Sequence, residues 1–529
     1  MVAGSEGVQR QDQWQTVANA VVSHGKHQIR LGGDSLQLTP ARHDTNPSFG
    51  LITQNLEDML NTRNLWTAVS TPQNRRSVLA EDSLFVQDTW RIHPQLTLSL
   101  GLRWEFAAPP ELKVLSGSSA NPFLPAPARF SPPPLYLFSG QASVWPRTYT
   151  NLAPRFGLAF RPSAESRTVF RAGWGIFYDS SLSIGTDLVN GGPFTLSQYQ
   201  SAMHAPFPTL LSYGFMPGLR LPAVRQWSAT VEHAFGGRQL VSAVYEGSAG
   251  RQLLRREIAL QDVESFWLAL ATNNGLSRYD ALQFQYRLTG SHGFSGLASY
   301  AWAHSIDNSS SDSELQWVGP GLNAARDRGS SDFDVRHSFV ADVSYEPPRK
   351  HSGSFSSWLL NGWGLDGIVR ARTGFPITVL NADYSMGLSF ANVFRPDLVP
   401  GQPVWLSDPS APGGRRLNSA AFQEAPGLVQ GELGRNAIAG FGMYQIDFAL
   451  RRDFAVAERR SFQFRIEAFN ALNHPNFADP LRYLSSPLFG QANSMLNMML
   501  GTGSPGSGMA PLFQNGGARS LQVMMRFRF

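Results

Sequence analysis

The side chains with the clearest potential for chemistry are two groups of carboxylates in the middle of the chain. In chain order they are Asp307, Asp312 and Glu314, followed by Asp327, Asp332 and Asp334. Carboxylate oxygens are ligands that Ca²⁺ prefers, and a calcium-binding loop spaces them regularly around an invariant glycine. Neither group has that spacing or that glycine. We therefore expect solvated loop carboxylates, and the sequence predicts no metal site and no other cofactor.

The other motifs with catalytic potential are equally weak. Gly501–Gly506 reads GTGSPG, which matches a phosphate-binding glycine motif, but that motif needs a strand before it and a helix after it. Because Pro505 lies inside the segment, a flexible loop is expected instead. The chain has no cysteine, which excludes thiolate catalysis and thiolate metal sites. No G-x-S-x-G or H-E-x-x-H sequence occurs either, so we do not expect an enzyme.

Composition narrows the class of protein. Charged residues make up 16% of the chain, against about 25% in soluble domains, while aromatic residues reach 12%. The net charge of +5 is too small and too evenly spread for a nucleic-acid-binding surface. A chain that is poor in charge and rich in aromatic residues needs elements that hold many residues away from water.

These elements are predicted to be strands, because apolar residues recur at every second position. Leu96–Phe106 reads LTLSLGLRWEF, with an apolar residue at each even position and polar residues or glycine between them. Successive side chains of a strand point to opposite faces, so this segment has one apolar and one polar face. Such runs match the ~9–11 residues with which a tilted strand crosses a membrane. Strands of a soluble sandwich are shorter, about five or six residues.

Short and long connections alternate along the chain. The short ones are turn-forming pieces such as Ile92–Gln95 and Gly236–Arg238. The long ones are expected to be irregular and comprise residues 107–152, 179–223, 249–278, 305–333, 374–442 and 471–517. Transmembrane barrels have short periplasmic turns and long extracellular loops. The sequence thus predicts an all-β fold, a large antiparallel transmembrane β-barrel in the outer membrane of a Gram-negative bacterium.

The expected barrel occupies residues 13–529, and residues 1–12 are expected to be a disordered or truncated start. The first strands are predicted near Trp14–Ser23 and Lys26–Gln37, and the whole chain carries about 15 to 16 strands. Bacterial barrels made from a single chain have even strand numbers. We therefore expect an N-terminally incomplete barrel, in which Met1 is a truncation or a misassigned start.

Several segments resemble the barrel of TonB-dependent outer-membrane receptors, in particular the Oar-like group found in Acidobacteria. They follow one another along nearly the whole chain: Leu96–Glu105, Ala153–Phe160, Phe170–Asp179, Val244–Leu253, Ser277–Gln283, Ser299–Asp307, Arg328–Val340, Gly362–Val379, Gly434–Gly442 and Phe464–Phe477. The resemblance implies about 22 strands in a complete member, preceded by a carboxypeptidase-regulatory-like domain and a plug domain. Neither domain is found before Trp14.

Two sets of residues are candidates for assembly or binding. The terminal strand alternates apolar and mostly polar residues, and the resemblance implies that the barrel-assembly machinery reads the apolar ones: Leu521, Val523, Met525, Phe527 and Phe529. A last strand with a free edge can be engaged by strand addition. Aromatic residues in the long loops could contact an extracellular ligand or pack against one another. They are Phe130, Tyr136, Phe138, Trp145, Tyr199, Tyr213 and Phe215.

The resemblance implies a receptor or transporter barrel that binds or takes up an extracellular ligand, such as an oligosaccharide, a peptide or a metal chelate. Its expected partners are outer-membrane lipid, the barrel-assembly machinery, the ligand and, only through a plug domain upstream, the TonB complex. No nucleic-acid partner is expected. Two alternatives stay open, a passive porin or structural barrel and a secreted all-β adhesin or glycan-binding protein.

Overall fold

The computed structural model covers the chain and describes residues 2–3, 7–44, 48–52, 66–70, 74–116, 146–179, 196–201, 209–216, 218–262, 266–310, 315–317, 324–348, 361–381, 394–425, 430–457, 460–499 and 516–528. These residues form a strand-rich fold whose largest sheet has 23 strands. Within the described ranges, no helix has the length and apolar character needed to cross a membrane.

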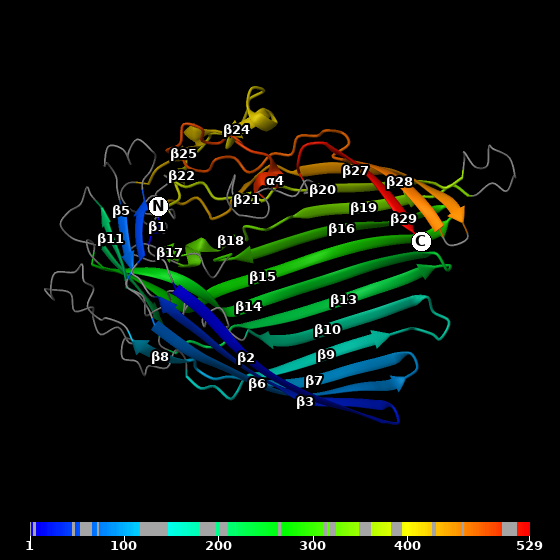
Figure 1. Cartoon of the computed structure of the whole chain (residues 1–529), viewed down its shortest axis with the longest axis horizontal. Coiled ribbons are helices and arrows are strands. Elements are labelled where there is room, and N and C mark those ends of the chain that lie inside the picture. Colours follow the sequence, from blue (N-terminus) through cyan, green and yellow to red (C-terminus); the bar gives the residue numbers. More distant parts are fainter. Residues whose placement is uncertain are drawn as a thin grey trace.

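Fifteen long strands make one antiparallel wall, in which each strand pairs with the next long strand along the chain (Figure 1). They are β2 (Gly7–His24), β3 (His27–Asp44), β6 (Asn74–His93), β7 (Leu96–Ala107), β9 (Leu152–Phe160), β10 (Thr168–Tyr178), β13 (Ala223–Phe235), β14 (Gln239–Asp262), β15 (Phe266–Ser291), β16 (Phe294–Asp307), β19 (His337–Tyr345), β20 (Trp363–Arg372), β27 (Met443–Ala457), β28 (Arg460–Phe469) and β29 (Ser520–Arg528). The predicted meander of 15 to 16 strands is confirmed. The first of these long strands begins at Gly7, earlier than the apolar alternation from Trp14 indicated. Residues 7–12, which were expected to belong to a disordered or truncated start, are therefore part of β2.

The connections carry shorter elements. The short strands are β1 (Val2–Ala3), β4 (Ser48–Ile52), β5 (Trp66–Ser70), β8 (Glu111–Ser116), β11 (Leu196–Ser201), β12 (Thr209–Phe215), β17 (Leu315–Trp317), β18 (Gly329–Ser330), β21 (Pro376–Ile377), β22 (Asp397–Leu398), β23 (Trp405–Ser407), β24 (Arg415–Leu417), β25 (Phe422–Gln423) and β26 (Ile438–Ala439). The helices are the 3-10 turns η1 (Ala324–Asp327), η2 (Pro412–Gly414) and η3 (Ser419–Ala421), and the single turn α4 (Leu496–Met499).

The register gathers the apolar residues of neighbouring strands into common rows. Leu100 of β7 lies opposite Phe156 of β9, Phe156 opposite Trp174 of β10, and Trp174 opposite Trp227 of β13. We call the side of the wall that carries this row the apolar face and the other side the polar face. Leu100, Phe156 and Trp174 remain 41–45% exposed. Exposed apolar rows of this extent mark a surface that water does not cover.

Short turns gather at one end of the wall and long connections at the other (Figure 1). Gly25 and Gly236 open two of the short turns with φ of +58° and +63°, a backbone conformation that glycine adopts without steric cost. The C-terminal end of β29 lies at the short-turn end, because Arg528 pairs with Ser461 at the start of β28. The predicted alternation of short and long connections is therefore confirmed.

One expected loop is wrong. Residues 249–278 were predicted to be irregular, but β14 and β15 continue through most of this segment as a paired arm beyond the rows of the wall. A register shift between Gly250 and Leu253, with Gln252 at φ +56°, separates the arm from the wall. A bulge of this kind bends a strand and reverses which side chains share a face, so the simple alternation is lost there.

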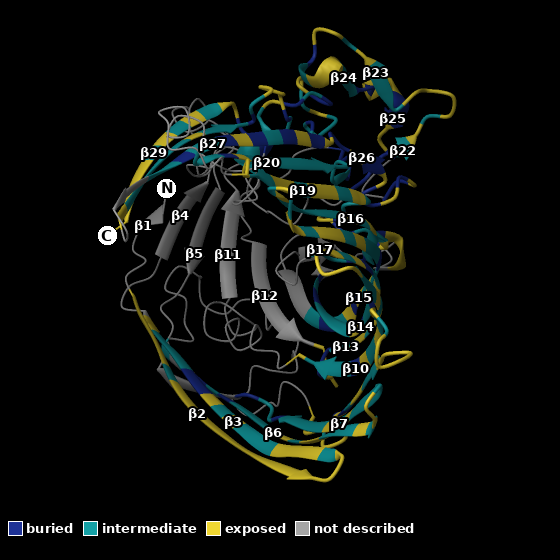
Figure 2. Cartoon of the chain, turned by 90° about the vertical axis from the view of Figure 1, so that its right-hand side faces the viewer, coloured by how far each residue is buried: buried dark blue, intermediate teal, exposed yellow. Residues whose placement is uncertain are grey.

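The wall is strongly curved, with β2 and β29 at its two edges (Figure 2). Within the described residues, β2 pairs with β3 and β29 pairs with β28, and neither has a second neighbour. A curved antiparallel wall with one apolar and one polar face positions the candidate sites described next.

Candidate functional site

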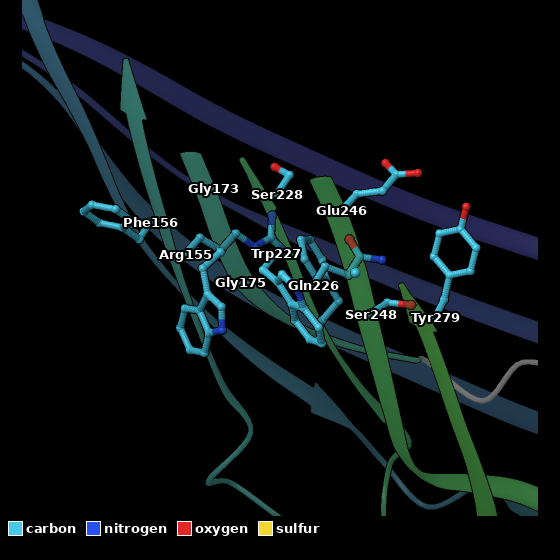
Figure 3. A pocket seen from close by; sticks show the side chains of 13 residues that line it. Arg155, Phe156, Gly173, Gly175, Gln226, Trp227, Ser228, Glu246, Ser248 and Tyr279 are labelled. Carbon is cyan, nitrogen blue, oxygen red and sulfur yellow. The ribbon is translucent and has the colours of Figure 1, made fainter. Parts of the chain in front are cut away.

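A recess of about 540 Å³ lies over β9, β10, β13, β14 and β15 (Figure 3). One row of the polar face crosses it, because Arg155, Gly175, Gln226, Ser248 and Tyr279 are successive partners across these strands. The glycine opens the floor of the recess, since a Cβ there would lie 3.2 Å from the Arg155 Cγ atom. The polar side chains of this row therefore surround an open position at Gly175.

Arg155 is the cation of this recess. Its guanidinium carbon lies 4.4 Å from the centroid of the Phe177 ring, which favours a cation over an aromatic face. Glu246 is the corresponding anion, and it accepts a 2.6 Å hydrogen bond from Gln283. The described residues of the recess provide hydrogen-bonding and stacking groups. This arrangement suits binding or passage of a polar solute.

A second recess of about 220 Å³ shares Arg155 and adds two more arginines of the polar face. Arg30 lies with its guanidinium carbon 5.9 Å from the Phe85 ring centroid. Arg103 donates a 3.1 Å hydrogen bond to Glu105, so one of the three arginines is paired with a carboxylate. The lining of this second recess therefore has a local excess of positive charge.

A buried cluster of charges joins the long connections to the wall at the long-loop end. We call it the rim cluster and define it as Arg255, Arg395, Arg435, Asp307 and Asp327, all of which are less than 9% exposed. Asp327 accepts from Arg255 at 2.5 Å and from Arg395 at 3.1 Å. Arg435 donates to Asp307, and its other terminal nitrogen donates to Asp332 at 3.0 Å. Buried charges are tolerated only when they are paired in this way.

Burial shifts the ionisation of the arginines in this cluster. It lowers the pKa of Arg435 to about 10, and the nearby Arg255 lowers it further in the same direction. Burial also lowers the pKa of Arg395, and Asp327 opposes that shift. Arg435 stays protonated at neutral pH, because its pKa remains well above 7. The arginines of the cluster therefore stay charged and are held by the carboxylates of Asp307, Asp327 and Asp332, and Arg255 also lies 3.4 Å from a Glu257 oxygen.

This finding corrects one expectation. Asp307, Asp327 and Asp334 were predicted to be solvated, but they are 4–7% exposed and paired with basic side chains. Asp332 is the half-exposed member, whereas Asp312 and Glu314 lie outside the described residues. Among the described residues, no group of three side chains is arranged to hold a metal ion.

Arg395 and Arg435 belong to a folded unit above the rim, which we call the cap and define as residues 376–381, 394–425, 430–441 and 470–499. The cap has its own hydrophobic core, made of Ile377, Val379, Leu417, Ala421, Phe422, Leu433, Ile438 and Phe489. The amide of Leu417 donates to the carbonyl of Gly490 at 3.0 Å, and that of Leu380 donates to Arg482 at 2.9 Å. Two connections expected to be irregular thus fold together.

Asp479 is a partly buried carboxylate in the cap. Burial raises its pKa from 3.8 to about 6, and Arg372 and Arg482 offset only part of that shift. A raised carboxyl pKa means that the folded cap binds the proton more tightly than the unfolded chain does, so the cap loses stability as the pH rises between about 4 and 6.

We expect Asp479→Asn to stabilise the cap by up to about 3 kcal/mol above pH 6 and to remove this pH dependence. Amide exchange of Leu417 and Ala421, measured between pH 4 and 8, checks the prediction. Glu424→Gln is the matched control, because Glu424 is exposed on the same unit. If the amides of Leu417 and Ala421 exchanged at the same rate in the Asp479→Asn and Glu424→Gln variants, the predicted stabilisation would be wrong.

The side chains of the loop aromatic residues proposed from the sequence all lie outside the described part of the structure. Tyr199 belongs to β11, and Tyr213 and Phe215 belong to β12, but their side chains are outside the described part of the structure. Phe130, Tyr136, Phe138 and Trp145 lie outside the described residues altogether, as does Gly501–Gly506. No sequence pattern indicated the rim arginines, although Arg435 lies in Gly434–Gly442, one of the segments that resemble the receptor family.

The terminal strand has the predicted alternation. On β29, Leu521, Val523, Met525 and Phe527 are 48–72% exposed and pair with the apolar-face residues of β28. Phe529 lies outside the described residues.

A curved antiparallel wall with an exposed apolar face, a charged polar face, short turns at one end and folded loops at the other defines an outer-membrane β-barrel. A family model for the outer membrane beta barrel domain matches residues 2–498, and the chain belongs to this family. Among curated proteins, none has a matching sequence.

Solved structures with a similar fold are outer-membrane transporters and receptors. The outer membrane transporter YddB from Escherichia coli is 10% identical with a TM-score of 0.57, and the match covers 98% of this chain and 55% of that one. The siderophore receptor PiuA from Acinetobacter baumannii is 10% identical with a TM-score of 0.47, covering 99% and 56%. The copper transporter OprC is 11% identical with a TM-score of 0.47, covering 99% and 60%. The chain thus spans little more than half the length of these proteins.

The family fixes the environment of the two faces. The protein is located in the outer membrane of a Gram-negative bacterium, with its apolar face toward lipid and its polar face toward the lumen. The polar rows of the recesses at Arg155 therefore face the lumen, and the cap stands at the end with long loops.

Proposed function

We propose that this barrel belongs to a TonB-dependent receptor of the Oar-like type, which binds an extracellular ligand and takes it into the cell. The cap carries this proposal, because a folded unit clasped by buried charges above a polar lumen provides a fixed surface for recognition. In this proposal, uptake requires a plug domain upstream of the barrel and contact of that domain with the TonB complex. The similarity to YddB supports the fold on which the proposal rests.

The second recess of the lumen wall favours ligands with negative charge. Arg30, Arg103 and Arg155 line one recess, and Glu105 neutralises only one of them. An anionic metal chelate fits this wall better than a neutral oligosaccharide or peptide does. The loop aromatics, including Tyr136, Trp145 and Tyr213, are proposed to contact the ligand before it reaches the wall.

Uptake by the native host tests this function. A strain without the gene and a complemented strain are supplied with a radiolabelled ferric catecholate, a maltooligosaccharide and a tripeptide. We expect uptake of the ferric catecholate to fall by on the order of tenfold without the gene, and to stop when an ionophore removes the proton gradient. Uptake that depends on the gene but persists with the ionophore would identify a passive porin instead.

The last strand is proposed to recruit the barrel-assembly machinery through Leu521, Val523, Met525, Phe527 and Phe529. Among the described residues β29 pairs only with β28, and its second edge and exposed apolar side chains suit recognition by strand addition. We expect deletion of Phe529 to abolish the heat-modifiable migration of the protein on a gel, because the chain no longer folds into the membrane. Deletion of Gly25 in a short turn, on the same assay, controls for general damage. Normal migration after loss of Phe529 would rule out the signal.

A further inference from the structure

Three arginines lie on the lipid-facing side of the wall at the long-loop end. Arg225 of β13 lies opposite Ala249 of β14, and Ala249 lies opposite Arg278 of β15. Arg251 shares the face of Ala249, because it is two residues further along the strand and pairs with Ala223. All three arginines are exposed. We call this set the arginine patch.

The patch retains a net positive charge. Arg278 donates to Asp280 at 2.6 Å, and Tyr245 donates to the same carboxylate at 2.8 Å. Asp280 thus forms an ion pair with Arg278. Neither Arg225 nor Arg251 forms an ion pair within the described part of the chain. The small residue Ala249 lies between Arg225 and Arg278, whose strands are two strand spacings, roughly 10 Å, apart.

The patch lies at one boundary of the hydrocarbon region. Ten residues separate Arg225 from Phe235 at the other end of β13. At about 3.3 Å per residue and a tilt of about 40°, they span about 25 Å, which is the height of the apolar band of such barrels. Trp227 marks the same boundary, with the Arg278 guanidinium carbon 5.6 Å from its ring centroid. Tryptophan and tyrosine are enriched at this level of the membrane.

We propose that the arginine patch binds a phosphorylated lipid headgroup of the outer leaflet. Guanidinium groups pair with phosphate oxygens in bidentate geometry, and two unpaired arginines beside Ala249 present that geometry toward the lipid. The apolar face below the patch receives the acyl chains, which a soluble phosphate lacks. The lipid would hold the β13–β15 segment of the wall at a fixed height in the membrane.

Titration of the full chain with bisphosphorylated lipid A tests the proposal. The protein is purified from outer membranes in detergent, and the apparent Kd is measured by native mass spectrometry. Arg225→Gln combined with Arg251→Gln leaves the Arg278 and Asp280 pair intact. We expect this double variant to bind about thirtyfold more weakly, since each basic residue near a charged membrane surface contributes about 1 kcal/mol. Dephosphorylated lipid A should bind the wild type as weakly as bisphosphorylated lipid A binds the double variant.

The matched control removes two other exposed arginines, by Arg238→Gln and Arg287→Gln. Arg238 lies in the short turn after β13, and Arg287 lies on the polar face of β15. Both are distant from the patch, so binding should stay within about twofold of the wild type. Arg225→Lys with Arg251→Lys should restore most of the affinity. Equal weakening in both glutamine variants, equal binding of dephosphorylated lipid, or displacement by inorganic phosphate at the same concentration would overturn the proposal. Heat-modifiable migration verifies that each variant is folded.

Discussion

Replacing Asp327 by alanine is expected to release the cap from the rim of the barrel. The Asp327 carboxylate accepts from Arg255 and Arg395, which are 0% and 4% exposed. Its removal leaves Arg395 without a carboxylate partner among the described residues and leaves Arg255 with only Glu257, whose oxygen lies 3.4 Å from the Arg255 Nε atom. Breaking a buried pair in this way costs about 3–5 kcal/mol. The loss exceeds the lost hydrogen bonds alone, because the Arg395 guanidinium must regain water or leave its site.

Amide exchange and limited proteolysis of the cap measure this effect. We expect protection of Leu417 and Ala421 to fall and cleavage within residues 394–425 to become faster, while heat-modifiable migration of the barrel persists. Asp408→Ala provides the control, because Asp408 pairs with Arg416 at 3.0 Å on the exposed surface of the same unit. Exposed pairs contribute little to stability. If the two variants exchanged at the same rate, the rim cluster would not hold the cap.

Replacing Phe284 by arginine is expected to destabilise the barrel in its membrane by about 2–4 kcal/mol. Phe284 lies on the apolar face, opposite Ala243 of β14 and Tyr300 of β16, and six residues from Arg278 along β15. This position is near the middle of the hydrocarbon band, where a charged side chain has no water. Urea unfolding of the protein refolded into lipid vesicles measures the change.

Gln285→Arg places the same charge one residue further along the strand. Gln285 lies on the polar face, where its amide donates to Ser299 at 3.3 Å. Because this face borders the lumen, the second variant is expected to unfold within about 1 kcal/mol of the wild type. The pair of variants separates the effect of position from the effect of charge. A larger loss for Gln285→Arg than for Phe284→Arg would reverse the assignment of the two faces.

The wall could be predicted from the sequence because its signal is local. The alternation in Leu96–Phe106 predicts β7, which the structure places at Leu96–Ala107. Each strand carries its own pattern, and short turns such as Gly236–Arg238 fix where it ends. The pattern failed in residues 249–278, because a bulge at Gly250 to Leu253 shifts the register of a strand that continues.

The cap and the rim cluster could not be predicted in this way, because their contacts join distant parts of the chain. Arg435 meets Asp307 across 128 positions, and Arg395 meets Asp327 across 68. Nothing within either local segment distinguishes such an aspartate from a solvated one. The only signal was that Arg328–Val340 and Gly434–Gly442 belong to the segments that resemble the receptor family, which indicated resemblance and not pairing.

The shared core of the cap has a consequence for transplanting specificity between barrels. Leu417 and Phe422 come from the connection after β20, whereas Phe489 comes from the connection after β28, and they pack in one cluster. Exchanging either connection alone would expose the remaining half of the hydrophobic core of the cap to water. A graft that carries new recognition must therefore move both connections together, along with the acidic residues on β16 and η1 that anchor them. The unit of exchange in this protein is a pair of loops, separated by two strands, and not a single loop.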